Sequence, residues 1–328
     1  MAFSRIGVVG AGAWGLALAI AAERAGREVR LWGRPGGAFA ELAANRRSAK
    51  LPGITLPGSV ALVDALADLE GCDALLLAAP AQAARETSAA LAAALNGRPA
   101  LAICAKGVER GTAKFMTEAV GEAAPGFPLA VLSGPSFAAD VAAGLPTAVT
   151  LAADDPALAA SLADALQGPA LRLYDSDDPR GVEIGGAAKN VLAIACGAAA
   201  GLGLGASASA ALVARGFAEL GRFGAAYGAR PATLMGLAGL GDLVLTCASP
   251  QSRNFAFGFD LGRGLSPALA GGGKLAEGAF TAPALLHLAR ARGVDMPIAE
   301  SVNAVLAGEI SAREAVERLL SRPRKREY

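Results

Sequence analysis

The sequence predicts an α/β domain with a mostly parallel sheet over residues 1–180, followed by an all-α domain over residues 181–328. In the first part, short apolar runs alternate with alanine-rich segments, which is typical of a parallel sheet with helices on both faces. In the second part the strand-like runs stop, and long alanine- and leucine-rich segments with helical spacing replace them. A chain of 328 residues is long enough for two such domains.

Each predicted strand of the first domain is a short apolar run that ends near a turn residue. These runs are RIGVV (5–9), EVRLWGR (28–34), CDALLLAAP (72–80), PALAICAKG (99–107), PLAVLSGP (128–135) and PTAVTLAA (146–153). The alanine-rich segment 14–26 between the first two runs predicts a helix that ends at Gly26. The polar segment YDSDDPRGVE predicts a boundary between the domains near residues 175–182.

The second domain is predicted from amphipathic segments such as 284–293 and 312–322. One long stretch, 185–216, is different because it carries Lys189 and then no charge before Arg215. It is rich in Gly, Ala and Ser rather than Leu, Ile and Phe, so insertion into lipid would be weakly driven. The same holds for the N-terminal run, which superficially resembles a signal peptide. We expect a buried, closely packed helix after Lys189 and no integral membrane segment.

The charge balance and the cysteines exclude several classes of protein. The 30 basic and 29 acidic residues nearly cancel, which argues against a general nucleic-acid binder. The basic end RPRKREY (322–328) is interpreted as a solvated tail. The cysteines show no CxxC spacing and no nearby histidine, so neither a metal site nor a disulfide framework is expected. Reduced thiols in a cytoplasmic protein fit Cys72, Cys104, Cys196 and Cys247.

The segment GAGAWG places Gly10, Gly12 and Gly15 in the G-x-G-x-x-G spacing, directly after a predicted strand and at the start of a helix. Gly10 permits a tight turn, Gly12 lets the backbone approach a pyrophosphate, and Gly15 lets the helix pack on the strand. The N-terminus of the helix attracts the phosphates. The first domain is therefore predicted to have the Rossmann fold and to bind a dinucleotide.

The end of the second predicted strand bears on the choice of cofactor. NAD-selective sites usually have an acidic residue there for the ribose hydroxyls, but this chain has Gly33 and Arg34. An arginine can pair with a 2′-phosphate, so NADP(H) is favoured and NAD(H) stays open. A surface charge is the alternative interpretation of Arg34.

Reduction of a carbonyl by hydride needs a proton donor at the oxygen. The single histidine, His287, lies in an ordinary amphipathic segment, and the tyrosines lie outside glycine-rich or polar clusters. Among the lysines, only Lys106 and Lys189 follow apolar runs and stand among small residues. Burial disfavours an ammonium and lowers its pKa toward the working pH, which suits a general acid.

Three further clusters indicate a site. Gly134 and Ser136 follow a strand at its carboxyl end, and a glycine-rich loop delivers Asp242. The third cluster, Ser252–Asn254, flanks an arginine with hydroxyl and amide groups and suits a phosphate or a carboxylate. The alternatives are a turn for the first cluster, a helix cap for Asp242 or Ser252, and a surface arginine for Arg253.

These motifs identify the resemblance to a known family. Over nearly its whole length the chain resembles the NAD(P)-dependent glycerol-3-phosphate dehydrogenases of the bacterial type. The resemblance rests on GAGAWGLALA, AKGVE, LSGPSFAADVAAGLPTA, GVEIGGAAKNVLAIACGAAAGLGLG, GLAGLGDLVLTC and SRNFAFGFDLGRG. It implies reduction of dihydroxyacetone phosphate to sn-glycerol 3-phosphate with NADP(H) or NAD(H), a supply of glycerophospholipid backbone, a cytoplasmic location and a homodimer.

The resemblance also implies a role for individual residues. Lys189 is implied as the catalytic proton donor and acceptor. The implied substrate contacts are Lys106, Gly134, Ser136, Lys189, Asp242, Ser252, Arg253 and Asn254. The implied cofactor contacts, besides the three motif glycines, are Trp14, Arg34, Lys106, Ala138, Arg253, Leu275 and Glu277.

The chain departs from the family pattern in the stretch after GLGLG. The usual Asp-Asn-Ala followed by Arg is replaced by Ala206, Ser207, Ala208 and Ser209. Asp140 replaces a usual glutamate, and Ala214 stands where threonine is common. The changes at 206–209 support one alternative, a dinucleotide-binding homologue with impaired catalysis. A related two-domain dehydrogenase of the β-hydroxyacid type is the other alternative that stays open.

Overall fold

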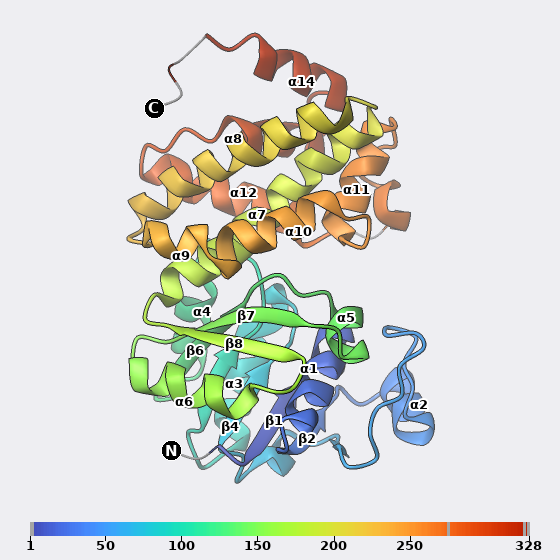
Figure 1. The fold of residues 1–328 in the computed structure, drawn as a ribbon, viewed down its shortest axis with the longest axis vertical. Coiled ribbons are helices and arrows are strands. Elements are labelled where there is room, and N and C mark those ends of the chain that lie inside the picture. The colour runs from blue at the N-terminus through green and yellow to red at the C-terminus, as the bar shows by residue number, and fades with distance from the viewer. Residues whose placement is uncertain (1–2, 274–275, 324–325, 327–328) are drawn as a thin grey trace. The chain divides into compact units, whose positions relative to one another are not determined.

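The structure is a computed structural model that describes residues 3–273, 276–323 and 326. By packing, the chain divides into two compact units (Figure 1): Met1–Lys106 with Lys114–Glu183, and Gly107–Ala113 with Ile184–Tyr328. The short segment 107–113 therefore packs with the second unit, whereas the sequence placed all of 1–180 in the first domain. The 180/181 boundary stays a prediction, because packing alone does not define a folding domain.

The first unit is built on an eight-stranded sheet with the order β3-β2-β1-β4-β5-β6-β7-β8. The strands are β1 Arg5–Val9, β2 Glu28–Trp32, β3 Ala61–Val63, β4 Ala74–Leu77, β5 Ala100–Ile103, β6 Leu129–Ser133, β7 Thr147–Ala152 and β8 Leu171–Ser176. All neighbouring strands pair in parallel except β6 and β7, which are antiparallel. The predicted mostly parallel sheet is confirmed.

Two strands were not predicted. β3 has only three residues, which are partly or fully exposed, so it carries no apolar run. β8 alternates buried and exposed residues at the edge of the sheet, and its outward side chains include Arg172 and Tyr174. The first residues of the polar segment, 174–176, belong to β8.

Helices and short helical turns connect the strands. They are α1 Ala13–Arg24, α2 Gly37–Asn45, α3 Ala84–Ala94, α4 Met116–Ala123, α5 Ala138–Ala143 and α6 Pro156–Leu166, with 3₁₀ turns at Leu66–Leu69 and Ala81–Ala83. In α1, every residue from Gly15 to Ala22 is buried. The apolar run that looks like a signal peptide is thus β1 followed by a core helix, and its hydrophobicity reflects packing against the sheet and α5.

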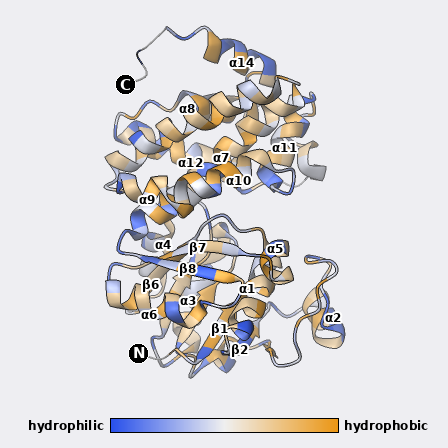
Figure 2. Cartoon of the chain, in the orientation of Figure 1, coloured by the Kyte–Doolittle hydropathy of each residue, from blue (hydrophilic) through white to orange (hydrophobic). Residues whose placement is uncertain are grey.

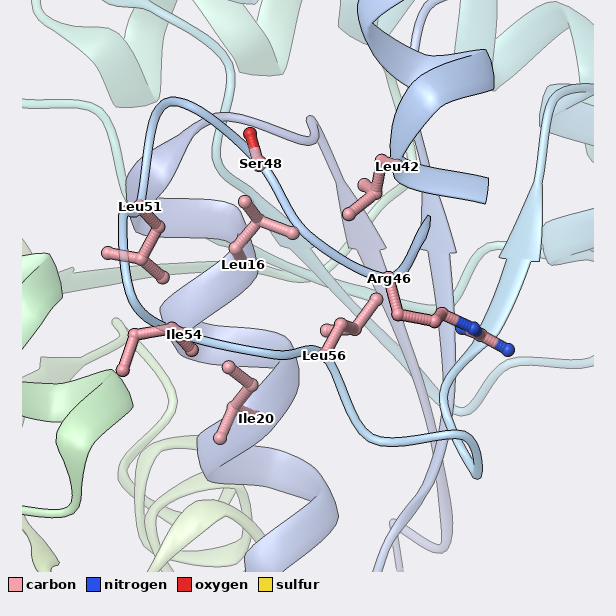
Figure 3. Close-up of a pocket in the computed structure, with 8 residues that line it drawn as sticks. All are labelled: Leu16, Ile20, Leu42, Arg46, Ser48, Leu51, Ile54 and Leu56. Atoms are coloured by element: carbon pink, nitrogen blue, oxygen red, sulfur yellow. The ribbon is translucent and has the colours of Figure 1, made fainter. Parts of the chain in front are cut away.

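The segment that follows α2 also packs against α1. Figure 3 shows a small pocket between them, with aliphatic side chains converging from α1, from α2 and from residues 51–56. Arg46 directs its guanidinium away from this aliphatic cluster (Figure 3), and its Nη1 donates to the Val60 carbonyl at 2.7 Å. The lining is that of core packing and shows no convergent polar groups.

In the described residues from 184 onward, every regular element of the second unit is a helix, as predicted. Its helices are α7 Pro179–Gly201, α8 Gly205–Ala226, α9 Pro231–Met235, α10 Asp242–Ala248, α11 Arg253–Gly262, α12 Glu277–Ala291, α13 Pro297–Leu306 and α14 Ala312–Leu320. A π-helical turn, Leu237–Gly241, precedes α10, and a 3₁₀ turn lies at Ala270–Gly273. Figure 2 shows both hydrophilic and hydrophobic segments along α14, which agrees with its predicted amphipathic character.

The apolar stretch after Lys189 forms two helices rather than one. α7 ends at Gly201, and α8 begins at Gly205 after a turn in which Gly203 has φ of +73°. α7 is long and apolar enough to cross a membrane, but 78% of its most apolar window is buried inside the protein, as in a core helix. The part after residue 205 differs, because Ala206 and Ser207 are exposed on α8. The expectation of one buried helix is confirmed for α7 and is wrong for the start of α8.

A buried carboxyl joins α8 to α13. Glu219, on α8, is 2% exposed and accepts hydrogen bonds from Ile298 N at 2.7 Å and Ala299 N at 3.3 Å. These amides belong to the first turn of α13, whose amides have no partner within the helix. Burial raises the pKa of Glu219 from 4.5 to about 7.

We predict that this carboxyl makes the stability of the protein depend on pH. The folded protein holds the Glu219 proton up to about pH 7, whereas the unfolded chain releases it near 4.5. Its contribution is therefore full below about pH 4.5 and falls by about 3 kcal/mol as the pH rises to 7. In urea titrations at several pH values, Glu219→Gln should show a smaller fall in the free energy of unfolding than wild type. Equal falls in both proteins would contradict this assignment.

Candidate active site

A glycine cradle lies at the carboxyl end of β1. Gly10 has φ of +120°, and its N–H donates to the Trp32 carbonyl at 2.9 Å. A Cβ on Gly15 would lie 1.8 Å from the Gly10 carbonyl oxygen, so only glycine lets α1 begin this close to the strand. A Cβ on Gly12 would meet nothing within 4 Å, and no side chain caps α1 there. Open space beside uncapped amides fits a dinucleotide pyrophosphate.

Two side chains near this cradle agree with a bound dinucleotide. The indole Nε1 of Trp14 is buried and has no hydrogen-bond partner among the described residues. Arg34 follows β2 and is exposed, while Gly33 packs so tightly that a Cβ there would lie 2.1 Å from the Phe39 ring. The residues present thus fit NAD(P), with a cation placed where a 2′-phosphate is read.

The carboxyl ends of β5 and β6 bring three of the predicted residues together. The Lys106 Nζ donates to the Gly134 carbonyl at 3.0 Å, and the Ser136 hydroxyl donates to the same oxygen at 3.0 Å. Gly134 has φ of +150°, and a Cβ there would lie 2.8 Å from the Val149 Cα. Ala138 is the first residue of α5 in the same segment. This edge of the sheet is where ligands bind in such folds.

Lys189 is buried in the second unit. Its Nζ donates to the Asp242 Oδ1 at 2.5 Å and to the Thr246 hydroxyl at 2.9 Å, and the three residues are 6%, 1% and 4% exposed. The Thr246 hydroxyl also lies 3.4 Å from the same carboxylate oxygen. The sequence argument considered burial alone, whereas the structure adds a carboxylate that stabilises the ammonium form. A protonated, fixed lysine is what a general acid requires.

The loop before α10 explains how Asp242 reaches α7. A Cβ on Gly185 of α7 would lie 2.5 Å from the Ala238 carbonyl oxygen, and one on Gly239 would lie 1.9 Å from the Leu234 carbonyl oxygen. The glycine-rich π turn therefore touches the backbone of α7 directly. Asp242 then begins α10, and Thr246, one turn later, points to the same face.

The third predicted cluster forms the start of α11. The Ser252 hydroxyl caps the helix by accepting from Phe255 N at 3.2 Å, which confirms the helix-cap interpretation of this serine. Arg253 is the first residue of α11 and is exposed. The Asn254 Nδ2 donates to the Asn190 Oδ1 at 3.0 Å, and its Oδ1 accepts from Gly278 N at 2.8 Å. The cluster therefore presents a guanidinium beside a fixed amide.

Two members of this arrangement were missed by the sequence reasoning, namely Thr246 and Asn190. Thr246 lies four residues after Asp242, and Asn190 directly follows Lys189, so both were within motifs already quoted. Of the remaining predicted residues, Glu277 begins α12, and Leu275 lies outside the described residues.

The cysteines and the histidine lie outside the hydrogen bonds that join Lys189, Asp242 and Thr246 in the described part of the chain. All four cysteines are free thiols and buried. His287 lies within α12. Among the described residues no group of three or more His, Cys, Asp or Glu side chains is arranged to hold a metal ion.

A dinucleotide cradle on a parallel sheet, in a chain whose helical unit buries a lysine beside a carboxylate, is characteristic of NAD(P)-dependent dehydrogenases. Comparison with known families specifies the class further. The model of the NAD-dependent glycerol-3-phosphate dehydrogenase N-terminus matches residues 5–159, and that of the C-terminus matches residues 178–317. The chain belongs to the NAD-dependent glycerol-3-phosphate dehydrogenase family, as its motifs indicated.

Individual relatives agree with this membership. A glycerol-3-phosphate dehydrogenase [NAD(P)+] of Azorhizobium caulinodans is 59% identical over 99% of both chains, and one of Methylobacterium radiotolerans is 57% identical over 97% of this chain and 96% of its own. A crystal structure of glycerol-3-phosphate dehydrogenase from Coxiella burnetii matches with a TM-score of 0.92 at 38% identity, covering 97% of this chain and 99% of that one. The predicted fold class is confirmed.

Proposed function

We propose that this chain reduces dihydroxyacetone phosphate to sn-glycerol 3-phosphate with NAD(P)H, and catalyses the reverse oxidation. The observation that carries the proposal is Lys189, buried and fixed by Asp242 and Thr246, on the helix that contacts the start of α11 with its exposed Arg253. Lys189 suits proton transfer at a carbonyl oxygen, and Arg253 suits binding of a phosphate. The relatives are named glycerol-3-phosphate dehydrogenases that use NAD(P)+, which supports glycerol 3-phosphate as one member of the substrate pair.

The first unit would hold the cofactor through Gly10, Gly12, Trp14, Gly15, Arg34, Lys106 and Ala138. The family resemblance implies Arg253, Leu275 and Glu277 as further cofactor contacts. NAD(P)H, when bound, supplies the hydride that reaches the carbonyl carbon. The cradle between β1 and α1 binds and orients the pyrophosphate through uncapped amides.

Lys189 donates a proton from Nζ to the carbonyl oxygen of the substrate, so that the ketone becomes an alcohol. In the reverse direction the neutral amine accepts the proton of the hydroxyl. Asp242 and Thr246 orient Nζ through their hydrogen bonds, and Asp242 also compensates the buried charge. Because the ammonium is held in place before substrate binds, little reorganisation is needed during the transfer.

The phosphate of the substrate binds at the start of α11, where Arg253 supplies charge and Ser252 and Asn254 supply polar groups. The guanidinium can bind two phosphate oxygens at once. The Nδ2 of Asn254 carries two hydrogens, and one of them donates to Asn190. The family resemblance implies Lys106, Gly134 and Ser136 as further substrate contacts.

The experiment is to follow NADPH and NADH oxidation with dihydroxyacetone phosphate and with a panel of 2-keto acids. We expect turnover with dihydroxyacetone phosphate and formation of sn-glycerol 3-phosphate equal to the cofactor consumed. Preference for a keto acid would support the β-hydroxyacid alternative instead. Cofactor binding without turnover on any substrate would indicate a homologue with impaired catalysis.

The family membership also supports three finer proposals: a homodimer, a cytoplasmic location and a supply of glycerol backbone to phospholipid synthesis. Light scattering of the purified protein tests the first. Fractionation of cells tests the second. Depletion of the protein, followed by labelling of lipids from glucose with and without added glycerol, tests the third.

Arg34 should select NADP(H) through the 2′-phosphate. Arg34→Ala removes a charge-assisted hydrogen bond to that group, and we expect the KM for NADPH to rise about tenfold or more, with the KM for NADH within about twofold. Steady-state kinetics with both cofactors measure this. Arg98→Ala, a change at an exposed arginine after α3, is the control and should alter neither value. An equal rise for both cofactors in Arg34→Ala would show that Arg34 does not contact the 2′-phosphate.

A further inference from the structure

α7 and α11 lie against each other in a constant register. Three pairs of residues in contact are Asn190 with Asn254, Ile194 with Gly258, and Ala198 with Gly262. Each step of four residues along α7 corresponds to a step of four along α11, so the two helices run parallel. The contact therefore extends from the first residues of α11 to its last.

Glycines on both helices make this contact one of backbone against backbone. A Cβ on Gly258 would lie 2.1 Å from the Ile194 carbonyl oxygen, and one on Gly262 would lie 2.2 Å from that of Ala198. From the other side, a Cβ on Gly197 would lie 2.0 Å from the Phe255 carbonyl oxygen, and one on Gly201 would lie 2.2 Å from that of Phe259. Each helix thus contributes a Gly-x-x-x-Gly motif to the contact.

Helix propensity does not explain why these four helical positions carry glycine in a chain so rich in alanine. Alanine favours helix at interior positions where glycine disfavours it, and the residues between the glycines of α7 are all alanine. The glycines therefore allow the two backbones to approach closely, and they do not stabilise either helix. Helices separated by side chains can shift as rotamers change, but a backbone contact has no such freedom.

The groups that act on the substrate lie at one end of this contact. Lys189 directly precedes Asn190 on α7, and Arg253 directly precedes Asn254 on α11, so the two cations occupy equivalent positions in the register. The hydrogen bond between the two asparagines closes the contact at that end. The separation of the lysine and the phosphate-binding residues is therefore fixed by how closely the two backbones approach.

We propose that the glycine contact between α7 and α11 sets the distance between Lys189 and the phosphate site, and so selects substrates by the number of carbons between carbonyl and phosphate. This inference rests on the proposed function. Gly197, Gly201, Gly258 and Gly262 are positioning residues, because they act through the helices and touch no reacting atom. A Cβ at position 258 needs ordinary van der Waals separation from Ile194, which requires a displacement of more than about 1 Å.

The test is Gly258→Ala, assayed with dihydroxyacetone phosphate, with dihydroxyacetone, and with a hydroxyketone phosphate that has one more carbon between carbonyl and phosphate. A displacement of this size costs up to about a hundredfold in a well-positioned site, so we expect kcat/KM for dihydroxyacetone phosphate to fall about 10- to 100-fold. The value for dihydroxyacetone should stay within about threefold, because that substrate makes no use of the phosphate site. The fall in kcat/KM should be smaller for the longer hydroxyketone phosphate than for dihydroxyacetone phosphate.

The matched control is Gly224→Ala on α8. A Cβ there would lie 2.5 Å from a Leu234 side-chain carbon, so the change strains the same unit without touching α7 or α11. It should leave the ratio of kcat/KM values for the phosphorylated and unphosphorylated ketones unchanged. Gly262→Ala, at the last residue of α11, is the second variant if Gly258→Ala does not fold, and its selectivity should change in the same direction.

Equal falls in kcat/KM for dihydroxyacetone phosphate and for dihydroxyacetone in a folded variant would overturn the proposal. An unchanged kcat/KM for dihydroxyacetone phosphate would overturn it as well. Failure of the proposed function gives a different result. In that case the wild-type protein itself would show no preference for dihydroxyacetone phosphate over dihydroxyacetone.

Discussion

Lys189→Ala should lower kcat for dihydroxyacetone phosphate reduction by about 10²–10⁴, the usual contribution of a positioned acid or base. In the proposed mechanism Nζ protonates the carbonyl oxygen, and its hydrogen bonds to Asp242 and Thr246 fix its direction. The KM for the cofactor should change little, because the dinucleotide cradle lies in the other unit. Steady-state kinetics in which both substrates are varied measure kcat and the KM for the cofactor separately.

The control for Lys189→Ala is Lys50→Ala, a change at an exposed lysine of the first unit outside the predicted site. It should retain wild-type kcat. A Lys189→Ala enzyme whose turnover stays within about tenfold of wild type would show that another group supplies the proton.

Asp242→Ala should destabilise the folded protein by about 3–5 kcal/mol, because it leaves the buried Lys189 ammonium without its carboxylate. Replacing both partners by apolar residues, in Lys189→Met with Asp242→Leu, removes the uncompensated charge. The double variant should therefore be more stable than Asp242→Ala. Urea unfolding monitored by circular dichroism measures both free energies.

An exposed ion pair in the same unit provides the comparison for Asp242. Asp295 and Arg322 pair at 2.7 Å, and their side chains are 48% and 39% exposed. Asp295→Ala should cost less than about 1 kcal/mol, as for other solvent-exposed pairs. If Asp242→Ala costs no more than this control, the Lys189 charge has another compensating partner.

The parts of the molecule that depend on local sequence were predicted well. The glycines at 10, 12 and 15 follow directly from a strand, a turn and a helix in succession, and the structure shows the tight turn and the close helix start. The helical second unit also follows from its periodicity. Lys189 was singled out by its apolar surroundings, and the family resemblance then distinguished it from Lys106.

The parts that depend on tertiary contacts were not predicted. Thr246 becomes part of the lysine site only because the glycine turn brings α10 against α7. The Asn190–Asn254 hydrogen bond joins residues that are far apart in the sequence. The break at Gly203 was hidden by the uniform composition of the stretch, which gives helical propensity on both sides of the turn.

The departures at 206–209 lie at the start of α8. Ser207 is exposed, and the Ser209 hydroxyl donates to the Gly205 carbonyl of its own helix at 3.3 Å. Nothing in the structure explains why serine stands at these two positions.

Amine rescue of Lys189→Ala tests the central claim most directly. If Nζ donates the proton, methylammonium should restore kcat for dihydroxyacetone phosphate at least tenfold, because a small protonated amine can replace the missing acid. Tetramethylammonium, which carries the charge but no proton, should restore nothing. The absence of any restoration by methylammonium, or an equal restoration by tetramethylammonium, would contradict the assignment of Lys189 as the proton donor.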